Sequence, residues 1–111
     1  MVGIGGNLIG KLQTKTTIKN EIGESISTWK TRHNLTGFLD YSSGDSKYLV
    51  YNAKVQESTH VFVCDYVPLA GDIKAENSRM TVNGKVYDIL LIDNPMELNY
   101  QLEIYLKFTG G

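Results

Sequence analysis

A short stretch in the second half of the chain, residues 79–93, constrains the fold most, and it reads RMTVNGKVYDILLID. Asn83-Gly84 lies between two β-prone segments, and this pair best tolerates the positive φ that both central residues of a type I′ turn require. A two-residue loop places Arg79 opposite Asp88, so that opposite charges face each other across the ladder. Residues 86–92 are apolar on both faces apart from Asp88, which predicts a strand covered on both sides. The sequence therefore predicts a tight β-hairpin organised by Arg79, Asn83, Gly84, Tyr87 and Asp88.

The rest of the chain is dominated by segments that alternate in polarity or are rich in β-prone residues. These segments are residues 11–19, 25–31, 35–41, 59–67 and 99–108. Such patterns predict strands, and Gly37 marks a bulge or a close approach of two backbones. Residues 32–34 interrupt the pattern and predict a break. We expect a mainly β fold, a small antiparallel β-barrel or sandwich of six to seven strands.

The domain organisation follows from the positions of the predicted strands. A chain of 111 residues is enough for one domain, which we place at residues 11–108. Residues 1–10 are a flexible Gly-rich arm without the features of a signal peptide, and residues 109–111 form a tail. Around residues 42–58 we expect a short helix, capped by Asp45, or a long loop.

Composition narrows the classes of function. The formal net charge is −1, whereas proteins that hold nucleic acid by its phosphates usually carry a basic excess. That balance argues against sequence-specific DNA binding but permits lining a channel through which DNA passes. No apolar run is long enough to cross a membrane, so we expect no membrane partner.

Residues that could carry chemistry are sparse. Cys64, the single cysteine, lies in an apolar strand and is expected to be a small core residue. His33 and His60 have no metal-ligand or catalytic spacing relative to it, so we predict no enzyme, no metal and no cofactor. We expect His60 to be a solvated or hydrogen-bonded edge residue and Trp29 to anchor the barrel rim or core.

The second half of the chain carries a motif that points to a known family. Arg79, Gly84, Tyr87 and Ile89 stand at the spacing Arg-hydrophobic-x-hydrophobic-x-Gly-x-x-Tyr-x-Ile, after a strand that ends in Asp65-Tyr66. Over residues 14–108 the chain resembles the head-tail joining proteins of long-tailed bacteriophages, also called head-closure or stopper proteins. In that family the preceding strand often ends in Arg-Tyr, so Asp65 is a departure.

The resemblance implies a small β-barrel with an insertion between its early and middle strands, without a cofactor. It implies a ring of copies in the neck of the virion, below the portal or adaptor ring and above a tail-completion or tail protein. Such a ring retains packaged DNA, contacts it non-specifically and offers the tail a docking surface. Assembly would take place in the cytoplasm of the bacterial host.

The insertion is the natural place for contacts with the channel or with partners, because its exposed tyrosines suit interfaces. The candidate residues are Ser43, Asp45, Lys47, Tyr48, Tyr51, Lys54 and Gln56. Two other functions fit the same pattern. One is a tail-completion or tail-terminator ring protein, and the other is a small oligonucleotide-binding β-barrel, for which Lys47-Tyr48 is the best support.

Overall fold

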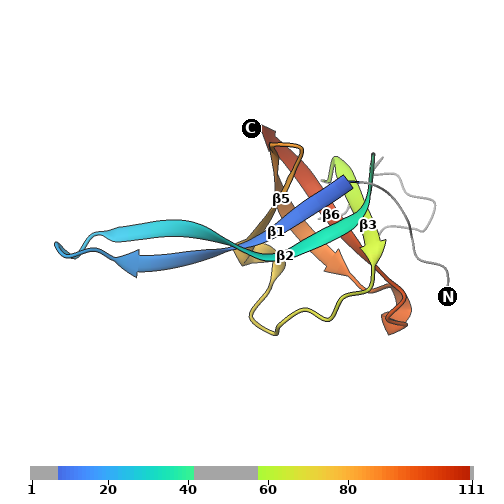
Figure 1. The fold of residues 1–111 in the computed structure, drawn as a ribbon, viewed down its shortest axis with the longest axis horizontal. Helices are drawn as coiled ribbons and strands as arrows, with labels where there is room; N and C mark the ends of the chain where they lie inside the picture. The colour runs from blue at the N-terminus through green and yellow to red at the C-terminus, as the bar shows by residue number, and fades with distance from the viewer. Residues whose placement is uncertain (1–7, 42–57, 111) are drawn as a thin grey trace.

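The computed structural model describes residues 8–41 and 58–110, drawn in colour in Figure 1. These residues form six strands and two short 3₁₀ helices. In chain order they are β1 (Leu8–Lys19), β2 (Ser25–Tyr41), β3 (His60–Asp65), η1 (Ala75–Asn77), β4 (Ser78–Val82), β5 (Lys85–Asp93), η2 (Pro95–Glu97) and β6 (Gln101–Gly110).

The strands close into an antiparallel barrel with the order β1-β2-β3-β6-β5-β4. Closure comes from the pairing of β1 with β4, which aligns residues 10–14 with residues 78–82. A closed sheet leaves no unpaired edge, which is how small β proteins avoid edge-to-edge association. The predicted fold class, a mainly β antiparallel barrel, is confirmed.

Each strand contributes one row of alternating side chains to the interior. Phe62, Leu12, Met80, Ile104 and Leu106 are among the largest side chains that are fully buried. Burying a side chain of this size contributes roughly 1.5–3 kcal/mol relative to leaving it exposed. Cys64 is 1% exposed and belongs to this core, as predicted. The core is therefore a single cluster to which every strand contributes.

The β4–β5 hairpin has the predicted register, with Met80 opposite Tyr87 and Arg79 opposite Asp88. Asn83 and Gly84 both have positive φ, 52° and 77°, as the two-residue loop requires. The expectation that β5 is covered on both sides holds only in part, because Tyr87 and Ile89 are buried whereas Leu90 is half-buried. A barrel has one interior, so each strand can bury only one of its two faces completely.

The expected break at residues 32–34 is also wrong, because β2 runs without interruption for 17 residues. Leu12 pairs with His33 while Gln13 pairs with Thr31, so Arg32 is the extra residue of a β-bulge. A bulge accommodates one surplus residue and redirects its side chain without ending the strand. The polar residues that interrupt the pattern therefore mark this bulge.

Beyond the bulge, β1 and β2 leave the barrel together as the protruding hairpin, which we define as residues 15–31. It extends far to the left of the barrel in Figure 1 and accounts for the molecule's long dimension, in extents of 51 × 30 × 26 Å. Trp29 lies at the root of this hairpin and is 37% exposed, so it does not belong to the core. Its ring contacts Arg79 of β4 at the rim of the barrel, which agrees with the alternative that it anchors the rim.

Candidate assembly surfaces

The candidate residues of the insertion fall outside the described part of the chain. These are Ser43, Asp45, Lys47, Tyr48, Tyr51, Lys54 and Gln56, and with them the expected helix or loop. The strand ends on either side are described: Tyr41 of β2 pairs with His60 of β3. The insertion therefore joins two neighbouring strand ends at one mouth of the barrel.

A row of aromatic rings crosses this mouth from four strands. The ring centroids of Tyr41 and His60 lie 5.1 Å apart, those of His60 and Tyr87 5.2 Å, and those of Tyr87 and Phe108 5.4 Å. These spacings are typical of aromatic pairs in mutual contact. Burial, followed by the nearby Tyr41, raises the pKa of Tyr87. His60 is half-buried in this row, and its Nδ1 lies 2.8 Å from Thr59 Oγ1, so it is a hydrogen-bonded residue at the start of β3, as one of the two sequence-based alternatives predicted.

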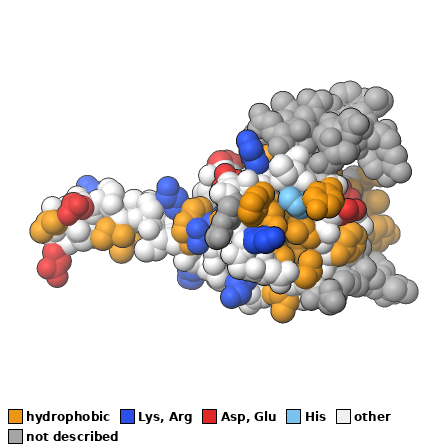
Figure 2. Space-filling view, turned by 90° about the horizontal axis from the view of Figure 1, so that it is seen from above, with side chains coloured by type: hydrophobic (Ala, Val, Ile, Leu, Met, Phe, Trp, Pro, Cys, Tyr) orange, Lys and Arg blue, Asp and Glu red, His pale blue; other side chains and the backbone are white. Residues whose placement is uncertain are grey.

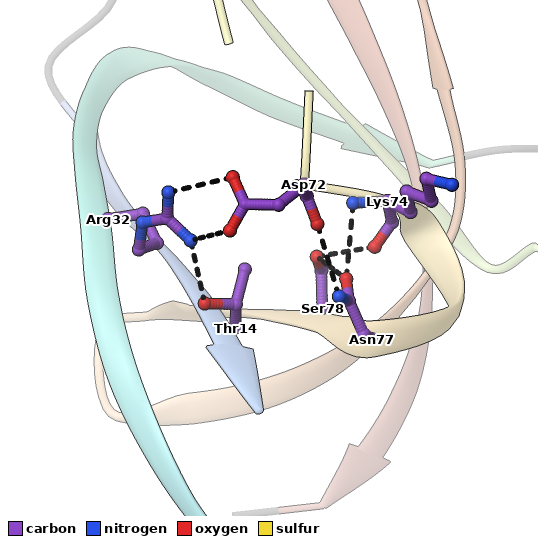
Figure 3. A network of polar contacts seen from close by, with 6 residues as sticks. All are labelled: Thr14, Arg32, Asp72, Lys74, Asn77 and Ser78. Atoms are coloured by element: carbon purple, nitrogen blue, oxygen red, sulfur yellow. Dashed lines mark hydrogen bonds and ion pairs between the residues drawn. The ribbon is translucent and has the colours of Figure 1, made fainter. Parts of the chain in front are cut away.

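Arg32, the bulge residue, secures the root of the protruding hairpin at the other mouth (Figure 3). Its guanidinium forms a bidentate pair with Asp72, with N–O distances of 2.7 and 3.0 Å, and donates to Thr14 Oγ1 at 3.3 Å. The hydrogen bond from Arg32 holds the pKa of Asp72 below its ordinary value. These contacts connect β1, β2 and the segment that leads from β3 to β4.

That connecting segment is itself ordered by hydrogen bonds (Figure 3). Asn77 Nδ2 donates to the Asp72 carbonyl at 3.2 Å, and its Oδ1 accepts from the Lys74 backbone N–H at 3.1 Å. Ser78 Oγ donates to the Lys74 carbonyl at 2.5 Å. Arg32 therefore binds a preformed loop, and a bidentate pair to a preformed loop restricts the direction of the hairpin.

Arg79 supports the hairpin from the opposite face of β1. Its Nε donates to Gln13 Oε1 at 2.8 Å, and its guanidinium carbon lies 4.4 Å from the centroid of the Trp29 ring. Gln13 and Thr14 are consecutive strand residues, so they point to opposite faces. Gln13 of β1 and Asp88 of β5 are the two cross-strand partners of Arg79, and its side chain contacts Gln13 at the hairpin root. The sequence pattern gave no signal for this contact.

The protruding hairpin exposes an apolar face. Ile18 and Ile26 pair directly across its two strands and are 53% and 40% exposed. Its tip is formed by local hydrogen bonds, because Asn20 Oδ1 accepts from the backbone N–H groups of Ile22 and Glu24. The shape of the hairpin is thus defined within the chain while its apolar residues remain uncovered.

A second apolar surface lies on the turn between β5 and β6, residues 94–100. Met96, Leu98 and Tyr100 are exposed, Met96 to 86%. The turn is held by Asn94 and Asn99: Asn94 Nδ2 donates to Asn99 Oδ1 at 2.8 Å, and the Asn99 backbone N–H donates to Asn94 Oδ1 at 3.1 Å. The turn therefore presents apolar side chains from a rigid, hydrogen-bonded loop.

Catalytic groups do not converge in the part of the chain that the structure describes. Within residues 8–41 and 58–110 no group of three or more His, Cys, Asp or Glu side chains could hold a metal ion. Burial, and next the neighbouring Asp65, raises the pKa of Cys64 to about 11, so its thiol is protonated at neutral pH. None of the helices in these same residues has the length and apolar character of a membrane span.

Comparison with known proteins agrees with the resemblance seen in the sequence. The model of the phage head completion protein family matches residues 10–107. Among curated proteins, no sequence matches the chain significantly.

Among solved structures, a chain in the virion of a native gene transfer agent particle has a similar fold. It matches with a TM-score of 0.58 and 13% sequence identity, over 96% of this chain and 100% of that one. The fold is thus found in a solved virion component, and the family match covers all six strands of the barrel except the first residues of β1 and the last residues of β6. The chain belongs to the phage head completion protein family.

Proposed function

We propose that the protein is a head-closure protein that forms a ring in the neck of the virion. The ring lies between the portal or adaptor ring and the tail, retains packaged DNA and provides the surface to which the tail docks. The family match over residues 10–107 is the observation that carries this proposal.

The architecture supports the proposal in two ways. The barrel is a closed unit with one core, which suits a passive building block. Of the eleven large hydrophobic side chains that are exposed in the described residues, seven lie on the protruding hairpin and the 94–100 turn. Exposed apolar patches bounded by polar residues are typical of protein interfaces. Copies in a ring need two different faces that fit each other, and this chain presents two such faces.

The insertion, residues 42–58, is the part that we place in the channel or against the adaptor ring. It leaves the barrel at the mouth lined by Tyr41, His60, Tyr87 and Phe108, and its polar residues suit a non-specific contact with DNA. Closure of the channel then depends on this segment, while the barrel positions it.

The test is a deletion of residues 44–57 in the phage that encodes the chain, with electron microscopy of the neck and a nuclease assay of DNA retention. We expect the variant protein to fold and the heads to lose DNA after packaging. The unaltered phage is the control, and imaging should place the chain in a ring at its neck. Variant heads that keep their genome and accept tails would refute the role in DNA retention.

A further inference from the structure

We propose that adjacent copies in the ring join when the protruding hairpin of one copy lies on the acidic wall of the next. We define the acidic wall as the outward surface of residues 86–106, from β5 through the 94–100 turn to β6. This inference rests on the ring of the proposed function and names the contact that would build it.

The strand order places the two surfaces on opposite sides of the barrel. In the closed order β1-β2-β3-β6-β5-β4, the pair β1–β2 lies across the interior from the pair β6–β5. Figure 1 shows the protruding hairpin reaching to the left and the turn before β6 at the lower right. A copy therefore offers the hairpin on one side and the wall on the other, which is the arrangement that a head-to-tail ring requires.

The hairpin carries an apolar face that the chain itself does not cover. Residues 15–19 and 21–31 are all exposed, so no sheet or helix of the described residues packs on this two-stranded segment. A two-stranded hairpin is only marginally stable in water without such a surface. Ile18 and Ile26 lie side by side on one face of the hairpin. Lys15 and Lys19 project from the opposite face, and this is the face that we place against the wall.

The wall carries exposed apolar side chains on a strained turn, residues 94–100. Met96, Glu97 and Asn99 all have positive φ, between 54° and 59°, a conformation that costs side-chain-bearing residues free energy. Hydrogen bonds between its two asparagines maintain the turn. In this conformation the turn holds Met96 and Leu98 outward. Strain of this kind is concentrated at functional positions.

Charge favours a second copy as the occupant of the wall. The stem of the hairpin carries Lys15, Lys19 and Lys30, whereas its tip carries Glu21 and Glu24. Residues 86–106 contain Asp88, Asp93, Glu97 and Glu103 and no Lys or Arg. Figure 2 shows lysine and arginine side chains along the stem of the hairpin. Lys107 faces Asp88 across the β5–β6 ladder, so the acidic part of the wall is formed by Asp93, Glu97 and Glu103. The lysines of the hairpin stem are complementary in charge to this part of the wall.

The wall also contains a pair of like charges that a cation from outside would relieve. Asp93 and Glu103 are direct partners across the β5–β6 ladder, both half-buried, and like charges in this position destabilise a sheet. The Glu103 carboxylate accepts hydrogen bonds from Gln101 Nε2 and from the Tyr105 hydroxyl, neither of which carries positive charge. A lysine of the neighbouring hairpin would compensate this charge.

Zero-length cross-linking of purified virions tests the contact. A carbodiimide joins a lysine amine to a carboxylate only where the two touch. We expect mass spectrometry to find Lys15 or Lys19 joined to Asp93, Glu97 or Glu103 in virions, and a ladder of linked copies on a denaturing gel. The dilute purified chain is the control and should give neither, because the hairpin and the wall of one copy lie on opposite sides of its barrel.

Charge reversal provides the second test. We expect Lys15→Glu with Lys19→Glu, or Glu97→Lys with Glu103→Lys, to lower the number of copies per neck by about tenfold, and the four changes together to restore it. Lys85→Glu, at the exposed β4–β5 turn, is the control and should have no effect. Circular dichroism of each purified variant verifies the barrel.

The outcomes separate this interface from the proposed function. A ring at the neck whose hairpin lysines are linked to a different protein, or not to residues 93–103 of a neighbour, would overturn the interface and leave the proposed function standing. Failure of the fourfold variant to recover would have the same meaning. Virions that lack the chain at the neck would overturn the proposed function itself.

Discussion

Gly37 is a residue at which a single added atom would disturb the barrel. A Cβ built on Gly37 would lie 2.9 Å from the carbonyl carbon of Val63 and 3.0 Å from Cβ of Cys64, closer than real Cβ atoms approach backbone. The glycine that the sequence marks as a close approach thus lets β2 lie against β3.

We predict that Gly37→Ala lowers the free energy of unfolding by roughly 1–3 kcal/mol, because the added methyl group must push β2 away from β3. Urea denaturation of the purified protein measures this. Gly71→Ala is the matched control, since nothing lies within 4 Å of its Cβ position. Equal stability of the two variants would show that the strands adjust without cost.

The negative charge of Asp93 destabilises the folded state. Burial, and next the neighbouring Glu103, raises the pKa of Asp93 above its ordinary value of 3.8. The folded state therefore binds this proton more tightly than the unfolded state, and ionisation of Asp93 destabilises the fold. The penalty is complete above the raised pKa and absent below 3.8.

We predict that Asp93→Asn is more stable than the unaltered protein at neutral pH, by up to about 1 kcal/mol. The advantage should shrink as the pH falls through the raised pKa of Asp93. Melting temperatures measured from about pH 3 to about pH 8 test this.

Asp72→Asn is the contrasting variant. Because the hydrogen bond from Arg32 lowers the pKa of Asp72, the ionised carboxylate stabilises the fold, and the variant should be less stable at neutral pH. This loss should diminish as the pH falls below 3.8 and through the lowered pKa. Parallel pH profiles for the two variants would contradict both assignments.

At the scale of elements, the protruding hairpin is separable from the barrel. The residues between its root and its tip are exposed, and Arg32 and Arg79 contact it only at the root. Lys15 and Trp29 are direct partners, so a two-residue turn can close the ladder at that point.

We predict that replacing residues 16–28 with Asn-Gly leaves the barrel folded, with a change in the free energy of unfolding below about 1 kcal/mol. Thermal unfolding measures this, and counting copies in the neck of the variant phage measures assembly, which we expect to be lost. A large loss of stability would show that the hairpin contributes to the folding unit, contrary to its exposure.

At the scale of the whole molecule, the barrel is one cooperative unit because its first strand closes onto its fourth. Pairing of β1 with β4 joins segments more than sixty residues apart, and all strands share one core. Loss of any core side chain should therefore weaken every strand together.

We predict that Phe62→Ala lowers the free energy of unfolding by about 3–5 kcal/mol, because Phe62 is fully buried. Circular dichroism and Trp29 fluorescence should report one coincident transition, since Arg79 of β4 contacts the Trp29 ring. Phe38→Ala is the matched control: Phe38 is 40% exposed, so its loss should be far smaller. Separate transitions would contradict a single unit.

Local patterns in the sequence determined the strands and their buried faces. The alternation in β6 identified Leu102, Ile104 and Leu106 as core residues, and Asn83-Gly84 identified the turn and its register. These predictions succeeded because strand periodicity and turn geometry depend on residues that are neighbours along the chain.

Only the tertiary structure decided which strands meet and where they leave the barrel. The continuation of β2 through Arg32 depends on a bulge opposite β1, and the direction of the Arg79 side chain depends on Gln13 and Trp29. The opposition of Asp93 and Glu103 likewise follows from the pairing of β5 with β6. Such contacts join distant parts of the chain, and periodicity carries no information about which distant partner a strand will have.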